Sequence, residues 1–358
     1  MGGRVITRQP LIPKQVVVSL ILITRSILTL HWRLQLDMDS ISSLQNKLDS
    51  GRIIVMDGGT GTEISRRGVT IDPRGSWSAN ANTEFPDMVR QIHIDYILAG
   101  AEIITTNTFS TSRATLANEG LSAQTEEINQ KSVSLAIEAR EHCDGAETVV
   151  IAGSMSAFEP KGHPEVTPSY EEALQDYREQ VKILVESGIQ LIALEMFSRT
   201  VDLKAAVQAA TETGLPIWVG LSCENHDGQI YLGIAGRYAG ETISDAVIAS
   251  SSPNVKAFCI MHSPPKVTAD ALKELRNCTS LPMGAYAHGG SIDDERGITQ
   301  NQEQGSQWEK YRRALGATDP EKYLEYVREW VRCGAIIVGG CCGTTPDHIR
   351  FLTTNNLK

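Results

Sequence analysis

Short apolar segments alternate with amphipathic segments along most of the chain after Met38. Several of the short segments are almost continuously apolar, such as Ile53-Ile54-Val55-Met56 and Ile336-Ile337-Val338. Continuous apolar runs of this length are typical of parallel strands that are buried on both faces. The pattern predicts eight strands, at Ile53–Gly58, Glu102–Phe109, Thr148–Met155, Leu191–Phe197, Pro216–Cys223, Val255–His262, Leu281–Ala287 and Ala335–Cys342.

An amphipathic segment with helical periodicity follows each predicted strand. These helices are predicted at Pro86–Ala99, Thr125–His142, Ser169–Ser187, Val201–Thr213, Gly240–Ser250, Thr268–Asn277, Pro320–Cys333 and Thr345–Thr353. Eight strand–helix units in a chain of 358 residues predict an α/β protein, a single (β/α)8 barrel of the TIM type. An open, doubly wound sheet is the alternative. The turn at Asp57-Gly58-Gly59-Thr60-Gly61 lacks both the spacing and the lysine of nucleotide-binding loops.

The first 37 residues differ from the rest of the chain, because their charged side chains before Asp37 are all basic. These are Arg4, Arg8, Lys14, Arg25 and Arg33. A basic segment without acids is typical of an organelle presequence. Alternatively, the working protein begins near Met38. We therefore divide the chain into an atypical N-terminal extension, residues 1–37, and a catalytic domain, residues 38–358.

The amino-acid composition of the chain limits the kinds of molecule that the protein is expected to bind. The net charge of −10 argues against a nucleic-acid-binding protein, which requires a basic surface. No apolar run reaches the roughly 20 residues of a membrane-spanning helix. The seven cysteines are odd in number and scattered, apart from one adjacent pair, so they do not resemble a disulfide framework. We expect a reducing, cytoplasmic setting, or organelle import if residues 1–37 belong to the protein, and small-molecule partners only.

Polar or thiol side chains stand at or just after the carboxyl ends of most predicted strands. In (β/α)8 barrels, catalytic groups lie at this end of the barrel. The residues are Asp57, Asn107, Glu195, Cys223, His262, His288, Cys341 and Cys342. Packing alone does not account for apolar strands that each finish in a polar or thiol residue. Glu195 lies inside an apolar run, where an unpaired carboxylate is costly, which favours a functional role.

The adjacent cysteines lie in the segment Gly339-Gly340-Cys341-Cys342-Gly343-Thr344-Thr345-Pro346. Neighbouring residues of a strand point to opposite faces, so both thiols reach one metal ion only if the backbone bends. The flanking glycines permit such a bend, and Thr345 with Pro346 predicts the start of the last helix. A buried apolar pair of cysteines is the alternative.

From about Gly51 to its C-terminus, the chain resembles the homocysteine S-methyltransferase family. The resemblance rests on the segments Asp57-Gly58-Gly59-Thr60-Gly61-Thr62-Glu63, Trp77-Ser78-Ala79, Ile103-Ile104-Thr105-Thr106-Asn107-Thr108-Phe109 and Gly339-Gly340-Cys341-Cys342-Gly343-Thr344-Thr345-Pro346-Asp347-His348-Ile349. It implies a TIM-type barrel with a catalytic zinc ion, Zn2+, bound by Cys341 and Cys342. It also implies that Asp57 and Glu195 hold the amino group of the amino-acid acceptor. We expect Asn107, within the matched segment, to contact the same acceptor.

The chain departs from the family pattern at three places in the expected active-site rim, one of which is the segment after the third predicted strand, Gly153-Ser154-Met155-Ser156-Ala157-Phe158-Glu159. Where the family has its third zinc ligand, a cysteine before a Pro-Pro pair, this chain has His262. The family's Pro-Asn-Ser-Gly-like segment reads Ala287-His288-Gly289-Gly290. Zinc accepts imidazole as readily as thiolate, and three protein ligands with one open position are typical of catalytic zinc. We therefore predict His262, Cys341 and Cys342 as the ligands.

Several alternatives stay open for this site. His262 is a core histidine if the zinc site has been lost, and His288 closes the site as a fourth ligand if the metal is structural. Cys223 is a further possible ligand, whereas Cys259 is expected in the core.

The expected reaction is methyl transfer to the thiol of homocysteine, which gives methionine. S-methylmethionine and S-adenosylmethionine are favoured donors because a sulfonium leaves as a neutral thioether and needs no general acid. The alternatives are another thiol, selenol or methyl donor, and a zinc-binding barrel without turnover. A metal-dependent hydrolase is disfavoured because the first strand offers Asp57 and no His-x-His pair.

Overall fold

Eight parallel strands form one sheet in the computed structural model, which describes residues 39–71, 76–157, 168–234, 237–238, 240–289 and 318–358. The order in the sheet is β1-β11-β10-β9-β5-β4-β3-β2. The strands are β1 (Ile54–Val55), β2 (Ile103–Thr105), β3 (Val150–Ser156), β4 (Leu191–Phe197), β5 (Ile217–Leu221), β9 (Val255–Met261), β10 (Met283–Tyr286) and β11 (Ala335–Val338).

The two ends of this order also meet. A parallel bridge joins Met56 to Ile103, and the amide of Asp57 donates to the carbonyl of Ile103 at 3.0 Å. The amide of Glu102 donates to the carbonyl of Val55 at 2.8 Å. These bonds link β1 to β2, so the eight strands form a ring. The predicted (β/α)8 barrel is confirmed, and the open sheet is excluded.

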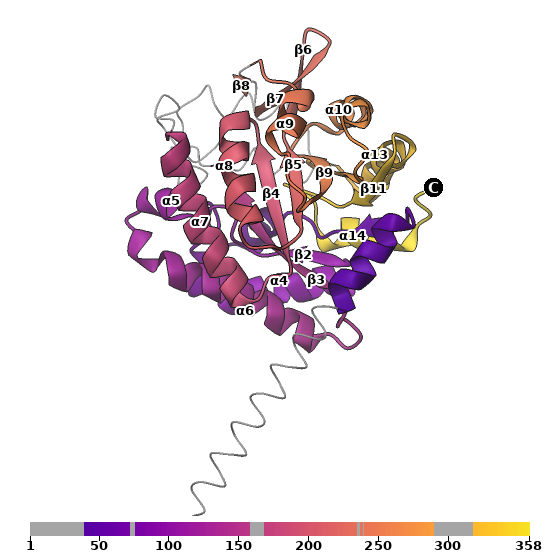
Figure 1. Ribbon diagram of the computed structural model, residues 1–358. Helices are drawn as coiled ribbons and strands as arrows, with labels where there is room; N and C mark the ends of the chain where they lie inside the picture. Colours follow the sequence, from indigo (N-terminus) through magenta and orange to yellow (C-terminus); the bar gives the residue numbers. More distant parts are fainter. Residues whose placement is uncertain (1–38, 72–75, 158–167, 235–236, 239, 290–317) are drawn as a thin grey trace, which may run out of the picture.

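Each of the eight predicted helices is present around the strands (Figure 1). They are α4 (Pro86–Leu98), α6 (Thr125–His142), α7 (Tyr170–Ser187), α8 (Thr200–Thr211), α9 (Ile243–Ala249), α10 (Pro265–Cys278), α13 (Pro320–Arg332) and α14 (Pro346–Thr354). Local chemistry sets their ends. Ser169 and Glu172 form a capping box at the start of α7, and Gly188 ends it with a φ of 105°.

The apolar pattern did not predict several short elements that follow the strands. They are α2 (Thr60–Arg66), α3 (Ala81–Glu84), α5 (Arg113–Ala117), a 3-10 helix (Ser122–Gln124), β6 (Cys223–His226), β7 (Gln229–Ile234) and β8 (Arg237–Tyr238). The last three strands form a small antiparallel sheet after β5. Asp227 and Gly228, at φ values of 52° and 85°, make its first turn. An Asp-Gly pair is a known hairpin signal, so this element was readable from the sequence.

The amino end of the barrel is closed by a helix that includes residues 39–49. Its Leu44 and Leu48 belong to the core cluster inside the barrel, with Ile54, Ile103 and Val150, which begin their strands. The predicted extension, residues 1–37, lies outside the described residues. Among the residues that are described, no helix is both long and apolar enough to span a bilayer.

Candidate active site

Three neighbouring strand ends bring four potential metal ligands together. His262 follows β9, His288 lies shortly after β10, and Cys341 and Cys342 lie shortly after β11. One nitrogen or sulfur atom from each of the four residues lies within 4.8 Å of all the others. The order of the strands in the ring explains this meeting, because β9, β10 and β11 are adjacent.

The spacing of three of these ligands fits a single zinc ion. The two sulfur atoms of Cys341 and Cys342 lie 3.9 Å apart, and Nδ1 of His262 lies 3.6 Å from the first and 4.0 Å from the second. A tetrahedral zinc ion with ordinary bond lengths requires about 3.8 Å between two sulfurs and about 3.6 Å between sulfur and nitrogen. The predicted ligand triangle therefore has the right size.

A tight turn places the two neighbouring thiols on one side of the backbone. The amide of Thr344 donates to the carbonyl of Cys341 at 3.1 Å, and its hydroxyl donates to the same oxygen at 2.7 Å. Gly343, inside this turn, has a φ of 82°, a conformation that favours glycine. The predicted bend at the cysteine pair is confirmed, and Thr345 and Pro346 begin α14 as expected.

A second backbone feature orients the histidine. His262 itself has a φ of 46°, which is uncommon for a residue other than glycine and costs about 1–3 kcal/mol. Its carbonyl accepts a hydrogen bond from the hydroxyl of Ser222 at 3.1 Å, and the hydroxyl of Ser263 donates to the carbonyl of Met261 at 2.8 Å. These bonds hold the strained strand end in place.

Two buried carboxylates occupy other strand ends: Asp57 follows β1, which is next to β11 in the ring, and Glu195 lies in β4. Oδ2 of Asp57 accepts from the amide of Thr105 at 2.7 Å, and the carboxylate of Glu195 accepts from the hydroxyls of Ser154 and Tyr286. Burial raises the pKa of Asp57 well above its usual value, and Glu195 raises it further. Burial also raises the pKa of Glu195, while its two hydrogen bonds act in the opposite direction. A cation between the two groups would be stabilised by both.

Comparison with known proteins identifies the family of the chain. The family model described as homocysteine S-methyltransferase matches residues 54–355. The chain belongs to this family. The family is one of methyltransferases, and the match spans the barrel strands and the four potential metal ligands.

Individual relatives agree with this assignment. The chain is 30% identical to homocysteine S-methyltransferase 3 of Zea mays, over 85% of this chain and 90% of that protein. It is 29% identical to the selenocysteine methyltransferase of Astragalus bisulcatus, over 84% and 91%. Among solved structures, the homocysteine methyltransferase MmuM of Escherichia coli in its metallated form matches with a TM-score of 0.70 and 26% identity, over 88% of this chain and 100% of that one.

The strand that carries Glu195 is irregular, which sequence reasoning missed. Its register against β5 shifts between Leu194 and Phe197, and Met196 between them has a φ of 60°. The amide of Met196 donates to the sulfur of Met261 at 3.0 Å. Bulges often redirect a side chain next to an active site, and this one lies directly after the carboxylate. No simple sequence signal marks it, because the segment reads as a regular apolar strand.

Asn107, the third predicted acceptor contact, lies in a buried polar network. Its amide nitrogen donates to the carbonyl of Ser78 at 2.9 Å and to the side chain of Asn82 at 3.0 Å, and its Oδ1 accepts from the hydroxyl of Ser78 at 2.6 Å. Both amide hydrogens are thus engaged. A contact with the acceptor would use the second lone pair of Oδ1.

The other cysteines near the strand ends are core residues. Cys223 and Cys259 are fully buried, and burial raises the pKa of each thiol. Neither belongs to the four-residue group of possible metal ligands found among the described residues. This agrees with the expectation for Cys259 and disfavours Cys223 as a ligand.

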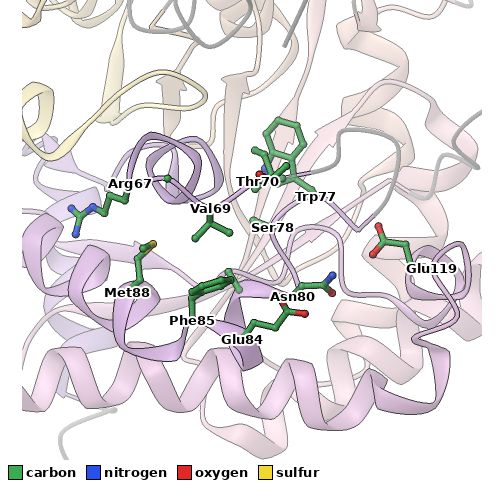
Figure 2. Close-up of a pocket in the computed structure, with 13 residues that line it drawn as sticks. Arg67, Val69, Thr70, Trp77, Ser78, Asn80, Glu84, Phe85, Met88 and Glu119 are labelled. Atoms are coloured by element: carbon green, nitrogen blue, oxygen red, sulfur yellow. The ribbon is translucent and has the colours of Figure 1, made fainter. Parts of the chain in front are cut away.

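A cavity of about 570 Å3 lies elsewhere, between the end of α2 and the start of α4 (Figure 2). Trp77, Phe85 and Met88 give it an apolar lining. Of its charged groups, Arg67 pairs with Glu63 and Asp95, and Glu119 accepts two hydrogen bonds from Ser76. None of the four metal-site residues lines this cavity. We therefore assign it no part in the reaction.

Proposed function

We propose that the chain transfers a methyl group from a sulfonium donor to the thiol of homocysteine and gives methionine, with zinc bound by His262, Cys341 and Cys342. The observation that carries the proposal is the triangle of these three ligands, which has the dimensions of a zinc site. S-methylmethionine and S-adenosylmethionine are the favoured donors. We place the reaction in the cytoplasm.

The role proposed for the metal is to activate the thiol of the acceptor. A free thiol is mostly protonated near neutral pH, and only the thiolate attacks. A zinc ion held by His262, Cys341 and Cys342 would supply a binding position that favours the thiolate form of the acceptor and fixes its sulfur in place. The homocysteine methyltransferase MmuM of Escherichia coli was solved in a metallated form, which supports a metal requirement for this chain.

The two carboxylates would bind the other end of the acceptor. Asp57 and Glu195 are buried, and burial raises the pKa of both, so an ionised pair in this position needs a compensating cation. The ammonium group of an amino acid supplies that charge. Asn107 would complete the wall of the same pocket. The metal would hold the sulfur of the acceptor and the carboxylates would hold its ammonium group. Because both ends are held, the acceptor would bind in one orientation.

The methyl step needs no proton donor. A lone pair of the acceptor thiolate forms the new bond to the methyl carbon, and the electron pair of the old bond returns to the donor sulfur. That sulfur leaves as a neutral thioether. The site is consistent with this chemistry. Its two buried acids are assigned to binding the ammonium group, and the reaction requires neither of them as a proton donor.

The histidine ligand changes the charge of the site. Two thiolates and one imidazole with Zn2+ sum to zero, whereas three thiolates sum to minus one. A neutral site favours loss of the acceptor proton, but the resulting thiolate is a weaker nucleophile. We therefore expect this chain to prefer a reactive donor or a more acidic acceptor. The selenocysteine methyltransferase among the relatives makes a selenol the second candidate acceptor.

The test is a zinc determination on the purified full chain, followed by assays that pair homocysteine or selenocysteine with each sulfonium donor. We expect about one zinc per chain and a methylated product detected by mass spectrometry. Absence of zinc would remove the metal assignment. Zinc without any methyl transfer would favour a barrel that binds metal but does not turn over.

A further inference from the structure

Two glycine-rich turns at neighbouring strand ends lie in direct backbone contact. The β1 turn, residues 57–62, begins with Asp57, and the β11 turn, residues 339–344, carries Cys341 and Cys342. The amide of Gly340 donates to the carbonyl of Asp57 at 2.9 Å. A Cβ atom at Gly59 would lie 2.5 Å from the carbonyl oxygen of Cys341, so no side chain fits between the turns at this point. A short backbone path therefore joins the carboxylate proposed to bind the ammonium group to the two thiols.

Two threonine hydroxyls form hydrogen bonds across this contact. Oγ1 of Thr62 accepts from the amide of Gly343 at 3.0 Å and donates to the carbonyl of Gly59 at 2.9 Å. Oγ1 of Thr344 accepts from the amide of Gly59 at 3.2 Å and donates to the carbonyl of Cys341 at 2.7 Å. Each hydroxyl thus donates its one proton within its own turn and accepts from the other turn. The two turns are locked to each other from both sides.

The surroundings of Thr344 keep this lock rigid. Thr344 is fully buried, and its carbonyl accepts from the hydroxyl of Tyr96 at 3.1 Å. Glycines leave the space for its hydroxyl, because a Cβ atom would lie 2.7 Å from it at Gly58 and 2.1 Å from it at Gly340. A buried hydrogen bond that is broken leaves its partner unsatisfied, so these bonds oppose any change in the spacing of the turns.

We propose that the hydroxyls of Thr62 and Thr344 are positioning groups that fix the distance between Asp57 and the two thiols, and that they thereby select the acceptor by its chain length. This inference rests on the proposed function, in which the ammonium group of the acceptor lies at Asp57 and its sulfur lies beside the thiols. Homocysteine and cysteine differ by one methylene, which is about 1.2 Å of chain. With a fixed span, an acceptor that is shorter by this amount reaches only one of its two binding positions.

The test is isothermal titration calorimetry of the purified, zinc-loaded full chain with homocysteine and with cysteine. We expect the unmodified chain to bind homocysteine at least about tenfold more tightly, since one methylene is worth about 10–200-fold in a fitted site. Thr62→Ala and Thr344→Ala should each lower this preference at least about threefold, with zinc per chain unchanged. Thr62→Ser and Thr344→Ser keep the hydroxyl and should retain the preference.

Thr353→Ala is the matched control. It removes a threonine hydroxyl that donates to the carbonyl of Ala99 at 2.7 Å, on α14 and outside both turns. The preference for homocysteine should stay that of the unmodified chain. If Thr344→Ala does not fold, Thr62→Ala decides the question, because Thr62 is only partly buried and tests the same lock from the other turn.

The outcomes separate this inference from the proposed function. An unchanged preference in the alanine variants, or equal affinities of the unmodified chain for the two thiols, would overturn the inference and leave the proposed function intact. Loss of zinc in both alanine variants would also overturn the inference, because the hydroxyls would then hold the metal ligands and not the span. Homocysteine that binds with the expected preference but is not methylated by a sulfonium donor would overturn the proposed function alone. A chain that binds neither thiol would overturn both.

Discussion

The two ends of the barrel are built on opposite principles. At the amino end, Leu44 and Leu48 of the first helix cover the apolar residues that begin the strands. At the carboxyl end, the carboxylates of Asp57 and Glu195 are buried, the potential metal ligands are partly or fully buried, and the two residues Met196 and His262 have backbone conformations that cost about 1–3 kcal/mol each. The comparison indicates that the amino end contributes stability and that the carboxyl end tolerates strain in order to place reactive groups. Substitutions at the two ends should therefore have separable effects.

The largest effect is expected from Cys341→Ala. Without this thiolate the zinc site loses a ligand, so the zinc content should fall sharply. The value of kcat/KM should fall by at least about 10^3-fold, equivalent to about 4 kcal/mol. Circular dichroism should show an intact fold, because the apolar end is unchanged. Cys278→Ala, at the last residue of α10 and outside the group of potential metal ligands, is the control and should keep zinc and activity. Normal zinc content in Cys341→Ala would contradict the ligand assignment.

At the opposite end, Leu48→Ala should lower the free energy of unfolding by about 2–5 kcal/mol, because it leaves a cavity under the barrel. The measurement is denaturant unfolding. Zinc per folded chain should stay the same. Asn46→Ala, exposed on the same helix, should change stability little. A loss of zinc equal to that of Cys341→Ala would show that the two ends are not separable.

The sequence predicted the strands and helices of the barrel better than it predicted the local shape of the site or the helix over residues 39–49 that closes the amino end. Parallel strands and their helices follow from periodicity, and all eight units were found. The bend at Cys341 and Cys342 was predictable because glycines flank the pair. The left-handed backbone at Met196 and His262 was not, because neither residue type favours it and only the surrounding contacts stabilise it. The meeting of His288 with the other potential metal ligands depends on the order of strands in the ring, which periodicity does not determine.

Asp57→Asn should separate binding from stability within the carboxyl end itself. Loss of the charge should raise KM for the acceptor by roughly 30-fold, about 2 kcal/mol, because the ammonium loses a charged partner. Burial raises the pKa of Asp57, so the ionised carboxyl destabilises the folded chain at neutral pH. The variant should therefore unfold at a higher temperature than the unmodified chain, by about 1 kcal/mol in free energy. A lower unfolding temperature would indicate that the charge is structural.

The same pKa shifts predict how acceptor binding depends on pH. Burial raises the pKa of Asp57 and of Glu195, so both carboxyls take up protons at higher pH than ordinary acids do. As the pH falls through these values, KM for the acceptor should rise, by up to about tenfold per pH unit for each group. The stability contribution of the two groups behaves in the opposite sense: it is present at low pH and is lost as the pH rises through the folded-state values. A KM that stays constant with pH would contradict the role of the carboxylates.

The smallest effect is expected from Tyr286→Phe, which changes the support of a site residue and leaves its charge in place. The hydroxyl of Tyr286 donates to Glu195, which also accepts from Ser154. Gly220 leaves the space that this hydroxyl occupies, because a Cβ there would lie 2.8 Å from it. Without the hydroxyl, Glu195 keeps one partner but is less well oriented.

We expect KM for the acceptor to rise about fivefold, equivalent to about 1 kcal/mol, with kcat and zinc content unchanged. Steady-state kinetics over a range of acceptor concentrations separates the two constants. Tyr231→Phe, on the small antiparallel sheet, is the matched control and should change neither. A fall in kcat with KM unchanged would show that Tyr286 acts on the methyl step itself and not through Glu195. That result would place Tyr286 among the groups that take part in the reaction. The reacting groups at the carboxyl end would then include a residue that we assign here only to supporting Glu195.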